Sequence, residues 1–154
     1  MYYANGYSAP FSHTKRGTRR SIIDWPFNYK LHGKMVANPS WREKNASGGD
    51  ISLHGQFMYG LEVPDMKSAW VETCVAAVKA GCKGCFIDQA NLNVAGDALA
   101  GGATKAAAAK YSAGHLAALT ELSHELALTG NYPILNHFGV NGSRAKGMSS
   151  PVTV

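Results

Sequence analysis

The chain has 154 residues, of which 45% are hydrophobic and 16% charged, so it can bury an ordinary core and is too apolar for a disordered protein. No run of 18 apolar residues occurs, which predicts no membrane span. The first residues lack the basic and apolar regions of a signal peptide. The compartment is left open, with secretion an option if a leader precedes this chain.

The net charge of +5 is uneven, because four basic residues gather near the start: Lys15, Arg16, Arg19 and Arg20. Such a cluster can bind phosphates. No recognition motif accompanies it, so we interpret it as a solvated loop and do not expect a nucleic-acid partner.

The first half of the chain predicts few regular elements. Residues 1–21 and 142–154 are expected to be irregular, apart from the tail of a strand over residues 1–5. A helix is predicted over residues 27–35, because Asp24 can cap it, Pro26 suits its first turn and Asn38-Pro39 ends it. A short aromatic strand is predicted over residues 55–63.

The second half alternates between helical and strand patterns. Apolar residues recur at a spacing of three and four over residues 66–80, which predicts a helix that Gly81 ends. A strand over 85–87, a long connection over 91–109, a helix over 112–128 and a strand over 132–136 follow. The alternation from residue 55 onward predicts parallel βαβ units with right-handed crossovers.

The three cysteines are Cys74, Cys82 and Cys85. Cys82 and Cys85 have the spacing of a zinc or redox pair, but a zinc site usually needs a second pair of ligands. We favour small buried thiols, and a disulfide that leaves one cysteine over remains the alternative.

Asp88 is the leading candidate for chemistry. It directly follows the short strand Cys85-Phe86-Ile87, and reactive groups collect at the carboxyl ends of parallel strands. There a carboxylate can act as a nucleophile, a general base or a ligand for sugar hydroxyls. Asn91 adds a polar group beside it. The alternative is an aspartate that holds the following loop in place.

Further candidates come from the neighbouring segments. Asn136 and His137 follow the next strand, so they are expected on the same side of the sheet as Asp88, in contact with substrate or in a structural loop. Glu62 ends the aromatic strand and is the candidate for a second carboxylate, or else a surface residue. Tyr59 and Trp25 would line a groove, although Trp25 also fits a helix start. His115 and His124 are nine residues apart and do not predict a metal pair.

Four short segments resemble a family of glycoside-hydrolase-like (β/α) barrels related to endo-galactosaminidases. They are Asn38-Pro39-Ser40-Trp41, Trp70 at a helix start, Gly84-Cys85-Phe86-Ile87-Asp88 and Pro133-Ile134-Leu135-Asn136. The resemblance implies that Asp88 is an acid in a carbohydrate cleft and that Asn136 lies in the same cleft.

The sequence thus predicts one α/β domain over residues 1–154, built as a partial or reduced TIM-type barrel with parallel strands, since a complete barrel needs about 250 residues. The expected activity is hydrolysis of a polysaccharide or oligosaccharide by paired carboxylates, Asp88 and Glu62, without a cofactor or a metal. Substrate contacts are expected from Asn136, His137, Tyr59, Asn91 and Trp25. The competing interpretation is a non-catalytic carbohydrate-binding or structural α/β module.

Overall fold

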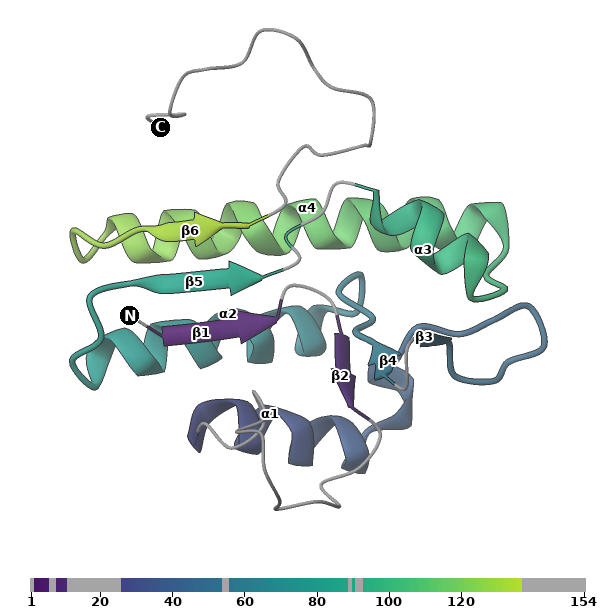
Figure 1. The fold of residues 1–154 in the computed structure, drawn as a ribbon, viewed down its shortest axis with the longest axis horizontal. Coiled ribbons are helices and arrows are strands. Elements are labelled where there is room, and N and C mark those ends of the chain that lie inside the picture. Colours follow the sequence, from purple (N-terminus) through teal and green to yellow (C-terminus); the bar gives the residue numbers. More distant parts are fainter. Residues whose placement is uncertain are drawn as a thin grey trace, which may run out of the picture.

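The centre of the fold is a three-stranded parallel sheet with the order β1-β5-β6 (Figure 1). The computed structural model describes residues 2–5, 8–10, 26–53, 56–88, 90 and 93–136. Within them, β1 spans Tyr2–Asn5, β5 spans Cys85–Asp88 and β6 spans Pro133–Leu135. The register aligns Ile87 of β5 with Ala4 on one side and Leu135 on the other. β5 is therefore the central strand.

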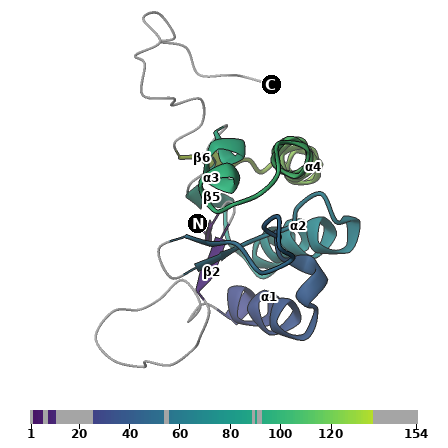
Figure 2. The same cartoon turned by 90° about the vertical axis from the view of Figure 1, so that its right-hand side faces the viewer.

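One face of this sheet is covered by two long helices, α2 (Pro64–Lys79) and α4 (Lys105–Ala127). Both lie behind the strands in Figure 1 and to one side of them in Figure 2. The strand burial alternates accordingly, since Cys85 and Ile87 are fully buried while Phe86 and Asp88 keep partial exposure. Successive side chains of a strand point to opposite faces. Asp88 therefore points away from the two helices.

A disulfide joins the central strand to one of these helices. Cys74 of α2 is bonded to Cys85 of β5, with their Cα atoms 6.1 Å apart. Cys82, in the turn between the two elements, keeps a free thiol and is partly buried. The expectation of three buried thiols was wrong, because the helix and the strand that follows it pack face to face and bring two of the sulfur atoms together.

The second sheet is antiparallel and has the order β2-β4-β3. Its strands are short: β2 spans Ser8–Pro10, β3 spans Ser52–Leu53 and β4 spans Gln56–Met58. Helix α1 (Pro26–Ala37) packs against α2 and is followed by a 3-10 helix, η2 (Pro39–Trp41). A second small core forms where β4 meets α3 (Val94–Ala100) and the first turns of α4; it contains Ile51, Met58, Val94, Ala98, Ala108 and Tyr111.

Arg42 ties the segment after η2 to its surroundings. Its guanidinium donates to the backbone carbonyls of Met35 at 3.1 and 3.3 Å and of Val36 at 3.1 Å, at the end of α1. It also binds the Asp50 carboxylate at 2.8 Å and lies 4.7 Å from the centre of the Phe57 ring. Carbonyls at a helix C-terminus have no partners within the helix, so Arg42 caps α1 and fixes the position of the residues that follow it.

The TIM-type barrel predicted from the sequence is wrong. The described residues form a mixed α/β fold with two separate three-stranded sheets, which is too few strands for a closed barrel. Only part of the predicted βαβ alternation is observed: β5 and β6 are parallel neighbours, but β4 pairs antiparallel with β2 and β3. The second neighbour of β5 is β1, from the start of the chain.

The helices agree better with the sequence. The predicted helices over 27–35, 66–80 and 112–128 correspond to α1, α2 and α4, although α4 begins seven residues earlier than expected. The connection predicted over 91–109 contains α3, which the flexible glycines concealed. Residues 1–21, expected to be largely irregular, contain β1 and β2, while 142–154 lie outside the described residues. None of the described helices combines the length and the apolar character needed to cross a bilayer.

Candidate functional site

Asp88 lies at the carboxyl end of β5, beside Asn136, which directly follows β6. The Asn136 side-chain amide donates a hydrogen bond of 2.8 Å to Oδ1 of Asp88. The backbone closes the same edge, because the Asn136 amide N–H donates to the Ile87 carbonyl and the Ala90 N–H donates to the Asn136 carbonyl, both at 2.9 Å. The proximity that the parallel strands predicted is therefore observed, and the Asp88 carboxyl is held in place while remaining partly exposed.

The face that carries Asp88 also presents apolar side chains. Phe86 and Asp88 alternate with the buried residues of β5, and the register pairs Phe86 with Ile134, which is 38% exposed. Figure 2 shows α2 and α4 on the other side of the sheet. Phe86, Asp88, Ile134 and Asn136 therefore form one patch, which we call the β5–β6 patch.

The other candidates from the sequence lie in different settings. Tyr59 is only 6% exposed and belongs to the main core, where burial raises the pKa of its hydroxyl, so it is not offered to a groove. Trp25, Asn91 and His137 fall outside the described residues. Glu62 is exposed on the short loop between β4 and α2.

Glu62 has a partner that the sequence analysis missed. The carboxyl of Glu43, which is 3% exposed, hydrogen-bonds the carboxylate of Glu62. Burial, and then the neighbouring charge of Glu62 and this hydrogen bond, raise the pKa of Glu43 to about 8. Glu43 is therefore mostly protonated at neutral pH. The negative charge of a neighbouring carboxylate disfavours ionisation of Glu43 in the same direction as its burial does.

The backbone explains why Glu43 is buried within a charged stretch. The Glu43 N–H donates to the Met58 carbonyl at 3.1 Å, and the Glu43 carbonyl accepts from Ile51 at 3.0 Å, so the segment is extended between two neighbours. Arg42 and Lys44 both bind Asp50 on one side of it. Glu43 must then point the other way, toward Glu62. The sequence shows that Glu43 stands between two basic residues, Arg42 and Lys44. This alternation is compatible with an extended segment but does not say which of its two sides is buried.

The Glu62 loop packs closely against two glycines, where a larger side chain would collide with it. A Cβ atom on Gly60 would lie 3.3 Å from the Glu62 Oε1 and 3.1 Å from the Trp41 carbonyl oxygen. A Cβ atom on Gly114, in the middle of α4, would lie 2.6 Å from the Glu62 Cα and 2.7 Å from the Leu61 carbonyl carbon. The loop therefore sits directly on the backbone of α4 and has a fixed position.

Asp88 and the Glu43–Glu62 pair lie at the same end of the helix–sheet layer. α2 begins at Pro64, two residues after Glu62, and the chain reverses after α2 to enter β5. Figure 1 shows β5 pointing toward the end of the layer at which α2 begins. The loop that carries Glu62 lies toward this end of the layer but packs against α4, on the side of the sheet from which Asp88 points away.

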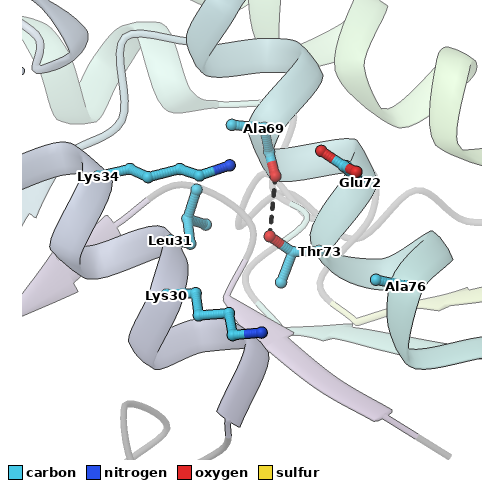
Figure 3. Close-up of a pocket in the computed structure, with 7 residues that line it drawn as sticks. All are labelled: Lys30, Leu31, Lys34, Ala69, Glu72, Thr73 and Ala76. Atoms are coloured by element: carbon cyan, nitrogen blue, oxygen red, sulfur yellow. Dashed lines mark hydrogen bonds between the residues drawn. The ribbon is translucent and has the colours of Figure 1, made fainter. Parts of the chain in front are cut away.

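A hollow of about 180 Å³ lies elsewhere, between α1 and α2 (Figure 3). Lys30 and Lys34 reach across it from α1, opposite Glu72 and Thr73 of α2. The Thr73 hydroxyl donates to the Ala69 carbonyl of its own helix at 2.8 Å, so it stabilises the hollow's wall. None of the residues predicted to act on substrate lines this hollow.

Among the described residues, no group of three or more histidine, cysteine, aspartate or glutamate side chains is arranged to hold a metal ion. Comparison with known proteins finds no family model and no curated protein that matches the chain. The function must therefore be argued from the two acidic groupings themselves.

Proposed function

We propose that this protein hydrolyses glycosidic bonds, with Asp88 as a carboxylate that reacts at the sugar and Glu62 as the second acid. The observation that carries the proposal is the position of Asp88, which ends the central strand of the parallel sheet and is oriented by the Asn136 amide. Two carboxyl groups that flank the bond are the usual equipment for this reaction. The resemblance of the segment around Asp88 to glycoside-hydrolase-like proteins supports the same activity.

The β5–β6 patch supports a sugar as the ligand. A pyranose offers an apolar face of C–H groups and an edge of hydroxyls. The patch places Phe86 and Ile134 next to the carboxylate of Asp88 and the amide of Asn136. The apolar face of a sugar could pack on the first two side chains, and its hydroxyls could hydrogen-bond the other two.

A non-catalytic carbohydrate-binding module is the second candidate, and the same patch favours it. In that case Asp88 would accept hydrogen bonds from sugar hydroxyls without taking part in a reaction. The two functions differ in what the Asp88 charge does, so one substitution separates them.

The deciding variant is Asp88→Asn, which keeps the shape of the side chain and its contact with Asn136 but removes the charge. We expect it to lower the release of reducing ends from a panel of soluble polysaccharides and aryl glycosides by at least about 100-fold, while binding to the same polysaccharides is retained. The matched control is Asp97→Asn on α3, which should keep both properties.

Wild-type protein that binds the polysaccharides without cleaving any of them would contradict the enzymatic proposal and favour the binding module. Hydrolysis that survives Asp88→Asn at the wild-type rate would assign the reaction to other residues. Loss of both cleavage and binding in Asp88→Asn, with both retained in the control, would contradict a purely catalytic role for the Asp88 charge.

A further inference from the structure

We propose that Asn45 is a modification site, which carries an N-linked glycan when the chain is made in the secretory compartment of a eukaryotic cell. The site lies in a surface turn over residues 45–49. Its first residues, Asn45-Ala46-Ser47, have the Asn-x-Ser pattern of glycan acceptors. The inference is independent of the hydrolysis proposed above, because the turn contains none of the residues assigned to that reaction.

The turn presents its tip to solvent from a fixed base. The Asn45 N–H donates to the Gly49 carbonyl at 2.8 Å, which closes the turn. The Ala46 N–H donates at 2.9 Å to the carbonyl of Gly102, between α3 and α4, and so anchors it. Residues 46–49 are exposed, and Figure 1 shows the loop that leads into β3 projecting outward at one side of the molecule. A glycan attached there would extend into solvent.

The partly exposed Asn45 side chain uses its oxygen in the turn and leaves its nitrogen over. Its Oδ1 accepts hydrogen bonds from the Ser47 N–H at 3.0 Å, from the Ser47 hydroxyl at 2.8 Å and from the Gly49 N–H at 2.9 Å. Its Nδ2 donates to no group among the described residues. This nitrogen is the atom to which an N-linked glycan is bonded, so the fold does not need it for another contact.

The glycines of the turn keep the space beside this nitrogen open. A Cβ atom on Gly49 would lie 3.1 Å from the Asn45 Nδ2, closer than side chains normally come, so a larger residue there would crowd the attachment point. Gly48 has a positive φ of 84°, a region that favours glycine, and lets the chain reverse at the tip. The turn therefore suits a bulky substituent on Asn45.

A second asparagine of similar sequence provides an internal comparison. Asn38-Pro39-Ser40 also has a serine two residues after an asparagine, but the intervening proline removes it from the acceptor pattern. Its side chain is also occupied, because the Asn38 Nδ2 donates to the Lys34 carbonyl at 2.8 Å at the end of α1. Asn38 thus serves the helix, whereas the nitrogen of Asn45 has no structural role in the part of the chain that the structure describes.

The disulfide is an independent observation that supports the same compartment. Cys74 and Cys85 are bonded to each other and are both buried in the main core. Structural disulfides persist in oxidising compartments such as the lumen of the endoplasmic reticulum and are rare in the cytosol. Asn-x-Ser acceptors receive their glycans in proteins that enter that lumen. The bond and the turn lie in different parts of the fold, so neither explains the other.

The modification is a transfer of an oligosaccharide from a lipid diphosphate carrier. The Asn45 Nδ2 forms a bond to the anomeric carbon of the first sugar, while the bond from that carbon to the diphosphate oxygen breaks. The electron pair of the broken bond stays on the diphosphate, and the nitrogen loses one proton. The product keeps Oδ1, so the three hydrogen bonds that Asn45 accepts in the turn persist.

The test is expression of the full chain behind a secretion leader in cultured eukaryotic cells. Asn141-Gly142-Ser143 has the same pattern and lies outside the described residues, so Asn141→Gln is introduced into every protein compared. We expect the secreted protein to migrate more slowly on a denaturing gel than the same protein made in bacteria. Treatment with a peptide-N-glycosidase should remove the difference, and mass spectrometry should then find aspartate at position 45.

The matched variants change only residue 47. Ser47→Ala breaks the acceptor pattern but keeps the two backbone hydrogen bonds to the Asn45 Oδ1, so it should abolish the shift while leaving the thermal midpoint near that of the bacterial protein. Ser47→Thr preserves the pattern and should retain the shift. Secreted, folded protein without a glycan would overturn the inference. A shift that survives Ser47→Ala would place the modification at another residue and would overturn it as well.

Discussion

Replacing Glu43 by glutamine should make the stability of the protein less sensitive to pH between about 5 and 8. Glu43 is 3% exposed, and burial next to Glu62 raises its pKa from the ordinary 4.5 to about 8. In this interval the folded protein keeps the proton of Glu43, while the unfolded chain releases it. The free energy of unfolding of the wild type must therefore decrease as the pH rises through this interval.

The magnitude follows from the distance between the two pKa values. Each pH unit over which only the folded state holds the proton is worth about 1.4 kcal/mol, so the full interval corresponds to at most about 5 kcal/mol. Because the charge of Glu62 contributes to the raised pKa of Glu43, part of this loss depends on both residues. We expect the contribution that Glu43→Gln removes to be on the order of 2–4 kcal/mol.

The assay is equilibrium unfolding in urea at pH 5, 6, 7, 8 and 9, with wild type, Glu43→Gln and Glu72→Gln measured side by side. Glu43→Gln should gain stability over wild type progressively from pH 5 to pH 8, with little further gain above. Glu72→Gln should follow the wild-type curve throughout. Parallel curves for wild type and Glu43→Gln would refute the claim that Glu43 holds a proton in the folded protein.

Three other predictions concern the framework around the site. Gly114→Ala should destabilise the protein by about 1–3 kcal/mol in urea unfolding, because the added methyl group meets the backbone of the Glu62 loop. Gly33→Ala, in open space on α1, should be neutral or stabilising. Equal effects of the two substitutions would contradict the close packing of the loop on α4. Reduction of the Cys74–Cys85 disulfide should lower the free energy of unfolding by about 3 kcal/mol, measured with and without dithiothreitol. Because Cys82 is not part of the disulfide, the Cys82→Ser variant should lose the same amount on reduction. An unchanged midpoint on reduction would refute the pairing. Arg42→Met should lower the free energy of unfolding by about 1–3 kcal/mol, because it releases the end of α1 and removes one of the cations that bind Asp50. The loss should exceed that of Lys44→Met, because the Lys44 side chain is more exposed than that of Arg42. The reverse order would argue against the capping role of Arg42.

The helices and the central strand were accessible from the sequence because local signals specify them. Apolar spacing, Pro64 at the first helical position and a lysine in the last turn mark α2 without reference to the rest of the chain. Gly81 and Gly84 mark the turn into β5, and both have positive φ, at 105° and 146°, a region that favours glycine. The hydrogen bond between Asn136 and Asp88 was likewise foreseeable, because parallel neighbours end at the same edge.

The arrangement of the strands was not accessible, because it depends on contacts between distant segments. The sequence places β4 directly before the α2–β5 unit, which suggests a βαβ crossover, but β4 is already paired on both sides by β2 and β3. The free edge of β5 is taken by β1, more than 80 residues away along the chain. Alternating patterns predict that strands exist and do not say which strands are neighbours.

The acid pair was missed for a similar reason. Glu62 was selected because it ends a strand, whereas Glu43 stands between two basic residues and has the local signature of a solvated segment. Its burial arises only when its segment is held between Met58 of β4 and Ile51, next to the Glu62 loop. A buried carboxyl of this kind can be found from the fold and not from a motif.

The covalent link between α2 and β5 has a practical consequence for making the protein. An alternative link from Cys82 to Cys85 would tie the strand to its own preceding turn, leaving the helix free to separate from the layer that carries Asp88. Expression in an oxidising host compartment, or with an isomerase present, should therefore yield more uniform material than expression in a reducing cytosol. Batches with different histories of thiol oxidation would otherwise differ in stability while appearing identical by mass on a denaturing gel.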